Sequence, residues 1–295
     1  MATASAAPRE RRFACTSCGA CCDRSPEMLL SEAAALADVF VFRLMFRVYE
    51  VPRLFAPGAA DDPAAASAGA FHESKRLLAA FAVRTRIVKR RHNARTVEYS
   101  RYLLISALTL DTGAAACTAL SGGLCGIYDR RPLACRALPF HYSRPEASAE
   151  RDLAAFVGTE GRACDTGGGA PVVLAQGRIV DPGSLRTREA ALQLRALEGR
   201  WQDSILHRLK TGFGTSLPSL AEIEANAGLG ATTTSMRVAW QIAAEAGLIG
   251  ADACRALIAA QAGVIERELA GQGGRPDARE TLAEMRAEYR LWLNG

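Results

Sequence analysis

Four cysteines fall within eight residues near the start of the chain, in the stretch Cys15-Thr-Ser-Cys18-Gly19-Ala-Cys21-Cys22. Gaps of two residues let the backbone fold back, so that successive sulfur atoms converge on one centre. Gly19 tolerates a positive φ angle where such a loop turns tightly. Neither a helix nor a strand presents side chains at this spacing to one point. The stretch therefore predicts a metal site on a loop.

The composition of the chain indicates the size of the protein, its cellular compartment and the role of its cysteines. The chain has 295 residues, 49% of them hydrophobic, which is enough to bury the core of one large or two modest domains. The apolar run from Val39 to Phe42 ends at Arg43, and residues 1–12 have no apolar segment typical of a secretory signal. We therefore expect a cytoplasmic protein with no membrane partner. Nine cysteines in a reducing compartment indicate metal binding and not a disulfide framework.

The segment after the cysteine cluster predicts two helices and then strands. The first helix is expected from Ser31, as its N-cap, to about Tyr49, because apolar residues recur at helical spacing. The second is expected from about Glu73 to Arg91. It ends in five basic residues: Arg84, Arg86, Lys89, Arg90 and Arg91. Because a helix C-terminus favours positive charge, this run does not favour a nucleic-acid partner. Residues from Thr96 to Leu110 predict one or two strands.

The second half of the cysteine pattern lies further along the chain. It consists of Cys117, Cys125, Cys135 and, beyond a charged stretch, Cys164. Pro132 is expected to open a short helix that carries Cys135. A short hairpin is expected between Pro171 and Pro182, with its turn at Gln176-Gly177. Further helices are expected at about 185–210, 220–227, 233–246, 251–269 and 278–293, with a capping box at Ser219 and Glu222.

These patterns predict an α+β protein that is mostly helical. We expect a flexible tail over residues 1–12, a small cysteine-rich metal-binding module over 13–170 and a helical C-terminal domain over 171–295. The arginine-rich helices of the last domain are compatible with a partner surface, and amphipathic core packing explains them equally well. The sequence identifies no particular protein or small-molecule partner.

Two cysteine signatures occur in a fixed order. They are Phe13-Ala-Cys15-x-x-Cys18-Gly19-x-Cys21-Cys22, and Cys117 with Cys125-x-Ile127-Tyr128-x-x-Arg131-Pro132-x-x-Cys135-Arg136-x-x-Pro139-Phe140. Together they closely resemble the bacterial CxxCxxCC proteins, a family described as a zinc- or iron-chelating domain. The resemblance covers about residues 12–164. It implies eight metal ligands, which here are Cys15, Cys18, Cys21, Cys22, Cys117, Cys125, Cys135 and Cys164.

The ligand types leave zinc and an iron-sulfur cluster as alternatives. Structural zinc sites usually pair two cysteine knuckles, and only the first half of the pattern has that spacing. Cys15-x-x-Cys18-x-x-Cys21 instead matches the three thiolates that hold a 4Fe-4S cluster in bacterial ferredoxins, where a fourth ligand comes from elsewhere. We therefore favour iron-sulfur (4Fe-4S) over zinc. Eight thiolates suit two four-sulfur centres, with Cys21 and Cys22 facing different ones, or one cluster with spare thiols.

Three functional classes remain open. The first is an iron-sulfur protein with a redox, structural or substrate-binding role, the second a zinc-stabilised interaction module, and the third a cluster-dependent modifying enzyme such as a methyltransferase. Arg130, Arg131 and Arg136 are expected to offset the negative charge of a thiolate centre, or to pair locally. His141 is expected to be an exposed loop residue, with a ninth ligand or proton donor as the alternative.

Overall fold

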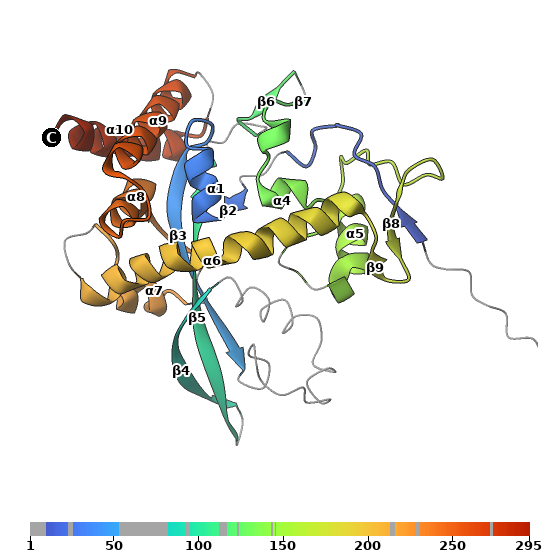
Figure 1. Cartoon of the computed structure of the whole chain (residues 1–295), viewed down its shortest axis with the longest axis horizontal. Coiled ribbons are helices and arrows are strands. Elements are labelled where there is room, and N and C mark those ends of the chain that lie inside the picture. The colour runs from blue at the N-terminus through green and yellow to red at the C-terminus, as the bar shows by residue number, and fades with distance from the viewer. Residues whose placement is uncertain are drawn as a thin grey trace, which may run out of the picture. The chain divides into compact units, whose positions relative to one another are not determined.

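The computed structural model combines helices with antiparallel strands, as Figure 1 shows. It describes residues 10–22, 26–52, 82–92, 95–111, 117–122, 124–142, 144, 146–212, 216–227, 230–271 and 274–295. Helices make up 47% and strands 23% of the structure, which confirms the predicted α+β class. Within these ranges, no helix is long and apolar enough to cross a lipid bilayer.

The chain forms two compact units, and each unit is built from two separate segments. Unit 1 comprises residues 1–24 and 119–194, and unit 2 comprises residues 25–118 and 195–295. These boundaries do not coincide with the division at residue 170 that composition indicates. The second boundary falls inside one long helix, α6 (Pro182–Thr211). The cysteine-rich N-terminus therefore folds with the middle of the chain.

Unit 2 is built on a five-stranded antiparallel sheet. Strands β10, β3, β5 and β2 are neighbours in this order, and β4 also pairs with β5. Their bounds are β2 Glu27–Met28, β3 Phe42–Pro52, β4 Val83–His92, β5 Arg95–Thr109 and β10 Thr232–Ser235. The strand predicted over residues 96–110 is confirmed as β5, which pairs with β3, β4 and β2.

The helix predicted from Ser31 to Tyr49 is largely wrong. Helix α1 covers only Leu30–Ala35, and the second half of the segment forms β3. Side chains that alternate to both faces of β3 are buried: Phe42, Leu44, Met45 and Phe46. A strand covered on both faces carries a nearly continuous apolar run, and such a run also satisfies helical spacing. Hydrogen-bond pairing with β5 makes this part of the segment a strand and not a helix.

The second predicted helix is also wrong where the structure describes it. Residues 83–91 of the predicted helix Glu73–Arg91 lie in β4, and residues 73–81 lie outside the described ranges. The basic residues at its end are therefore distributed over the two faces of a strand. The favourable effect of a helix C-terminus no longer explains their charge.

Gln261 holds the turn that separates α1 from β3. This residue of α9 (Ala251–Ala270) is fully buried. Its side-chain amide donates to the carbonyls of Ala37, at 2.8 Å, and of Phe40, while its oxygen accepts from the N–H of Phe42 at 2.9 Å. Three buried backbone groups at the start of β3 thus depend on one side chain that lies far away in the sequence.

Glu198 of α6 binds the beginning of α1. Its two carboxylate oxygens accept hydrogen bonds from the backbone N–H groups of Leu30 and Ser31, each at 2.8 Å. These N–H groups have no partner within a helix, because they belong to its first turn. Burial raises the pKa of the Glu198 carboxyl. A carboxylate from α6 therefore takes the place of the capping side chain that Ser31 was predicted to supply.

The C-terminal helices follow the predictions closely. Besides α9, they are α7 Leu220–Ala225, α8 Met236–Glu245 and α10 Pro276–Asn294. The predicted capping box is present at the start of α7, where the Ser219 hydroxyl accepts from the N–H of Glu222 at 3.2 Å. One difference is that residues 232–235, predicted to begin a helix, form β10 because they pair with β3.

Unit 1 consists of short elements around a small core. They are β1 Glu10–Arg12, β6 Leu120–Ser121, β7 Leu124–Cys125, α4 Leu133–Arg136, α5 Ala149–Val157, β8 Val172–Ala175 and β9 Arg178–Ile179. The predicted hairpin is confirmed as β8 and β9, with positive φ angles at Gln176 (53°) and Gly177 (76°) in its turn. The core residues are Phe13, Phe140, Ala149, Leu153, Val173, Leu174 and Ile179, with Cys164 packed against them.

Candidate metal centre

The N-terminal cysteine loop is joined to the segment that carries Cys164. Ala14 and Asp165 form an antiparallel bridge, with N···O distances of 2.7 and 3.1 Å. One residue further, the Thr16 hydroxyl donates to the carbonyl of Ala163 at 2.7 Å. Because the two segments run antiparallel, this pairing brings Cys15 beside Cys164. The cysteine furthest from the dense motif is thereby brought to the cluster at the N-terminus.

The loop itself has the backbone that the spacing predicts. Gly19 has a φ angle of 74°, and the N–H of Cys22 donates to the Gly19 carbonyl at 2.8 Å, which closes a tight turn. The N–H of Ser17 donates to the sulfur of Cys15 at 3.4 Å. Backbone N–H groups that point at sulfur stabilise the thiolate form, which is the form that binds metal.

The thiols influence each other's protonation. Burial raises the pKa of the Cys164 thiol, and the charges of Cys18, Cys21 and Cys15 raise it further. Burial likewise raises the pKa of Cys21, with contributions from Cys15 and Cys18. Hydrogen bonds from the backbone of Ala163 and Ala20 lower the pKa of the exposed Cys18 thiol. Cys15, Cys18, Cys21 and Cys164, called the cysteine cluster below, are therefore near enough for their charges to interact.

The other predicted ligands lie on other elements or, for Cys22, beside Cys21, with which it shares a side-chain hydrogen bond. Cys125 ends the β6–β7 hairpin, opposite Leu120, and Cys135 lies on α4, whose first residue follows Pro132 as predicted. Cys117 belongs to unit 2. None of the nine cysteines, all of which lie in described ranges, forms a disulfide. Among the described residues, no group of three or more His, Cys, Asp or Glu side chains is arranged to hold a metal ion.

Arg162 is the cation at the cysteine cluster, and the sequence analysis missed it. Its guanidinium stacks on the Phe156 ring, 4.1 Å from the centroid, and donates to the Phe156 carbonyl at 2.8 Å. Its Nε is buried and meets no acceptor among the described residues. The positive charge lowers the pKa of both Cys21 and Cys164. Its position two residues before Cys164 was the signal available in the sequence.

Removing this charge should make the neighbouring thiols harder to ionise. In the metal-free protein, Arg162→Gln is expected to raise the pKa of Cys164 and Cys21, so that their alkylation begins at higher pH. The measurement is the rate of iodoacetamide labelling at each cysteine against pH, read by mass spectrometry. Arg162→Lys, which keeps the charge, should restore most of the wild-type profile. Identical profiles for wild type and Arg162→Gln would contradict this role.

Arg131, one of the three arginines predicted to offset the thiolate charge or to pair locally, makes local contacts. The Arg131 side chain donates to the Tyr128 carbonyl at 3.0 Å and stacks on the Tyr128 ring, 3.7 Å from the centroid. His141 also differs from its prediction as an exposed residue. Burial lowers its pKa to about 4, and its ring stacks on Tyr142 with centroids 4.8 Å apart. His141 is therefore uncharged near neutral pH.

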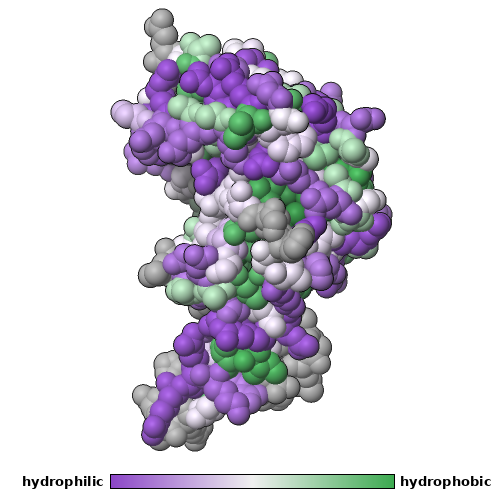
Figure 2. All heavy atoms as spheres, turned by 90° about the vertical axis from the view of Figure 1, so that its left-hand side faces the viewer, coloured by the Kyte–Doolittle hydropathy of each residue, from purple (hydrophilic) through white to green (hydrophobic). Residues whose placement is uncertain are grey.

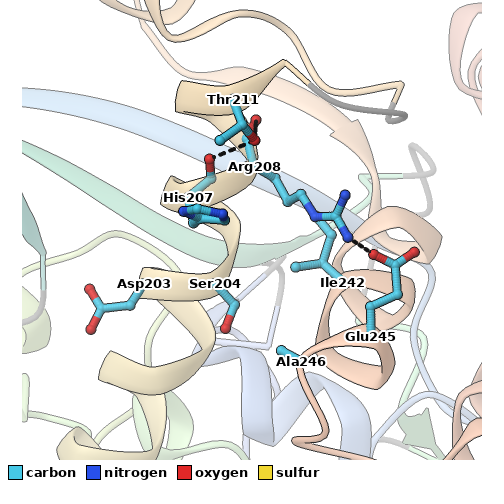
Figure 3. Close-up of a pocket in the computed structure, with 8 residues that line it drawn as sticks. All are labelled: Asp203, Ser204, His207, Arg208, Thr211, Ile242, Glu245 and Ala246. Carbon is cyan, nitrogen blue, oxygen red and sulfur yellow. Dashed lines mark hydrogen bonds and ion pairs between the residues drawn. The ribbon is translucent and has the colours of Figure 1, made fainter.

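Unit 2 has a pocket of about 670 Å³ between α6 and α8. Figure 3 shows Arg208 reaching from α6 towards Glu245 of α8, with which it forms an ion pair, while Ile242 and Ala246 face the space between the helices. His207 also lines it, and its carbonyl accepts from the Thr211 hydroxyl at 3.1 Å. Asp203 lines it as well, so the pocket holds two carboxylates, Asp203 and Glu245, and one guanidinium, Arg208.

Comparisons with known proteins add no relative. No family model, no curated protein and no solved structure matches the chain.

Proposed function

We propose that the protein binds a metal centre through the cysteines of unit 1, and that Cys15, Cys18, Cys21 and Cys164 hold one such centre. The observation that carries this proposal is the bridge between Ala14 and Asp165, which aligns the N-terminal loop with the segment of Cys164. Cys15 and Cys18 are exposed, so packing in the core of unit 1 does not account for these two thiols.

The donor set fits a four-thiolate site. Four sulfur atoms satisfy either a tetrahedral zinc ion or the four irons of a 4Fe-4S cluster. We favour the cluster, because three ligands in one short run and a remote fourth is the arrangement of bacterial ferredoxins. Cys22, Cys125 and Cys135 are the other thiols of unit 1 and are candidates for a second centre. The assignment of Cys117 remains a prediction from the sequence.

The chain's own residues would tune such a centre. When bound, a 4Fe-4S cluster supplies one-electron transfer. The N–H of Ser17 donates to the Cys15 sulfur, and Arg162 places a positive charge near Cys21 and Cys164. Both offset the negative charge of four thiolates, which favours binding and raises the potential of a cluster. Phe156, on whose ring Arg162 stacks, packs edge-on against Phe13 with the ring centroids 5.8 Å apart, which fixes the position of the guanidinium.

The test is metal and sulfide analysis of the chain purified without oxygen, together with its visible spectrum. We expect acid-labile sulfide, iron and broad absorption near ~400 nm, as for cysteine-held cubanes. The variant Cys254→Ser serves as a control and should keep the metal and sulfide content of the wild type. Its thiol lies buried on α9 and is not one of the predicted ligands. Stoichiometric zinc without sulfide would replace the cluster with a structural zinc site. A protein that binds neither metal would overturn the proposal.

A further inference from the structure

Strand β4 carries an unusual share of the charge of this protein. Its ten residues, Val83–His92, include five Arg or Lys and no Asp or Glu. The whole chain has 36 basic and 31 acidic residues, so the remainder contains 31 of each sign and is neutral. The net charge of +5 therefore resides, by count, in one strand of unit 2. This distribution is independent of the cysteines and of any metal.

Strands β4 and β5 form a two-stranded ribbon beyond the end of β3. The pairing of β3 with β5 ends at Pro52 and Tyr99, whereas β4 and β5 continue to pair from there to His92 and Arg95. Figure 1 shows this ribbon extending past the rest of the sheet. In the view of Figure 2, the coloured part of this end is mainly hydrophilic, with one smaller hydrophobic patch. The basic residues are therefore presented on a projecting element.

The two faces of the ribbon differ in what their charges contact. On one face, Arg86, Arg90 and Arg101 form ion pairs with two acids, Glu50 and Glu224. Arg101 is only 5% exposed, and this network joins β3, β4, β5 and α7. The positive charges of this face are thus used within the fold.

The opposite face presents its positive charges to solvent. It is defined by the residues that share a side in the strand register: Arg84, Ile87, Lys89 and Arg91 of β4, with Thr96, Glu98 and the buried Ser100 and Tyr102 of β5. Arg84 belongs to this set because a bulge between Arg84 and Arg86 adds a residue to β4. The only acid of the set, Glu98, meets Lys89 at 3.5 Å, and the Lys89 side chain is 70% exposed. This basic face is therefore open to a polyanion.

We propose that the basic face of the β4–β5 ribbon binds double-stranded DNA. A two-stranded antiparallel ribbon fits the major groove of B-form DNA, and basic side chains along it reach the phosphates on either side. Duplex RNA fits less well, because its major groove is deep and narrow. Charged residues, lysine above all, also protect edge strands from aggregation, but four of the five basic residues of β4 are arginine. The absence of any acid from β4 points to an anionic partner.

The test measures binding of the full chain to a short fluorescent DNA duplex of mixed sequence by anisotropy, at several salt concentrations. The variant Arg84→Glu/Arg91→Glu reverses two charges on the basic face. The matched control is Arg195→Glu/Arg200→Glu, which makes the same change in net charge at two exposed positions of α6. Thermal unfolding of each variant shows that the fold is retained.

We expect wild type to bind at about 50 mM salt with a Kd of about 1–100 µM, weakening steeply as salt rises. Arg84→Glu/Arg91→Glu should bind about tenfold or more weakly than wild type. Its plot of log K against log salt concentration should be less steep by about 2, because two phosphate contacts are lost. The control should stay within about twofold of wild type, since it contacts no phosphate. No binding by wild type, or equal losses in the two variants, would overturn the proposal. Equal affinity for duplex RNA or for polyglutamate would overturn the assignment to DNA.

Discussion

Replacing Cys164 with serine is expected to remove one complete metal centre per chain. A serine hydroxyl does not replace a thiolate as a ligand of zinc or of an iron-sulfur cluster under ordinary conditions. Loss of a ligand that touches the metal should exceed the ~10–100-fold loss of affinity typical of outer-shell changes. The measurement is the ratio of metal to protein, with the visible spectrum, after anaerobic purification and desalting.

A second variant tests whether Cys15 and Cys164 serve the same centre. If they do, Cys15→Ser/Cys164→Ser should lose no more metal than Cys164→Ser alone, because effects within one site are not additive. Cys254→Ser should retain the wild-type metal content. Full metal occupancy in Cys164→Ser would contradict the site, and a double variant that loses twice as much metal would assign the two cysteines to different centres.

Gln261→Leu is expected to lower the free energy of unfolding of unit 2 by roughly 3 kcal/mol or more, because three buried backbone groups lose their partner at ~1–3 kcal/mol each. Those groups are the carbonyls of Ala37 and Phe40 and the N–H of Phe42. Domains of this kind unfold at a cost of only roughly 5–15 kcal/mol. The change should therefore leave unit 2 marginally stable.

Urea unfolding followed by tryptophan fluorescence provides the measurement. All three tryptophans, Trp201, Trp240 and Trp292, belong to unit 2, so the signal reports that unit. Lys210→Leu also replaces a polar side chain by leucine, at an exposed position of α6 that belongs to unit 2, and should change stability by less than about 0.5 kcal/mol. If Gln261→Leu unfolds within ~1 kcal/mol of wild type, the bonds of Gln261 do not hold the start of β3.

Elements with strong local signals were predicted correctly. The ends of α9 lie at Gly250 and Gly271, the capping box of α7 uses Ser219 and Glu222, and the β8–β9 turn has the positive φ angles that Gln176-Gly177 implies. In each case the determining contacts join residues a few positions apart. Residue type and spacing over a few positions are therefore enough to predict these helix ends and this turn.

Elements whose partners are remote in sequence were predicted wrongly. The segment from Ser31 to Tyr49 has helical spacing, yet β3 forms there because it pairs with β5 and because Gln261 of α9 holds its start. Likewise β10, in the segment predicted as the first turn of a helix, is a strand because it pairs with β3. Tertiary pairing overrides weak local preference when both faces of a segment are buried.

The candidate metal centre likewise combines features that local sequence determines with features that depend on remote contacts. The sequence by itself determined the ligand type, the loop from Cys15 to Cys22 and the need for a positive φ angle at Gly19, because these depend on residue identity over a few positions. Only the tertiary structure decided that Cys164 joins that loop and that Arg162 supplies its cation, because both follow from a bridge between segments about 150 residues apart. Pairing over such a separation depends on the whole fold, and no local pattern encodes it.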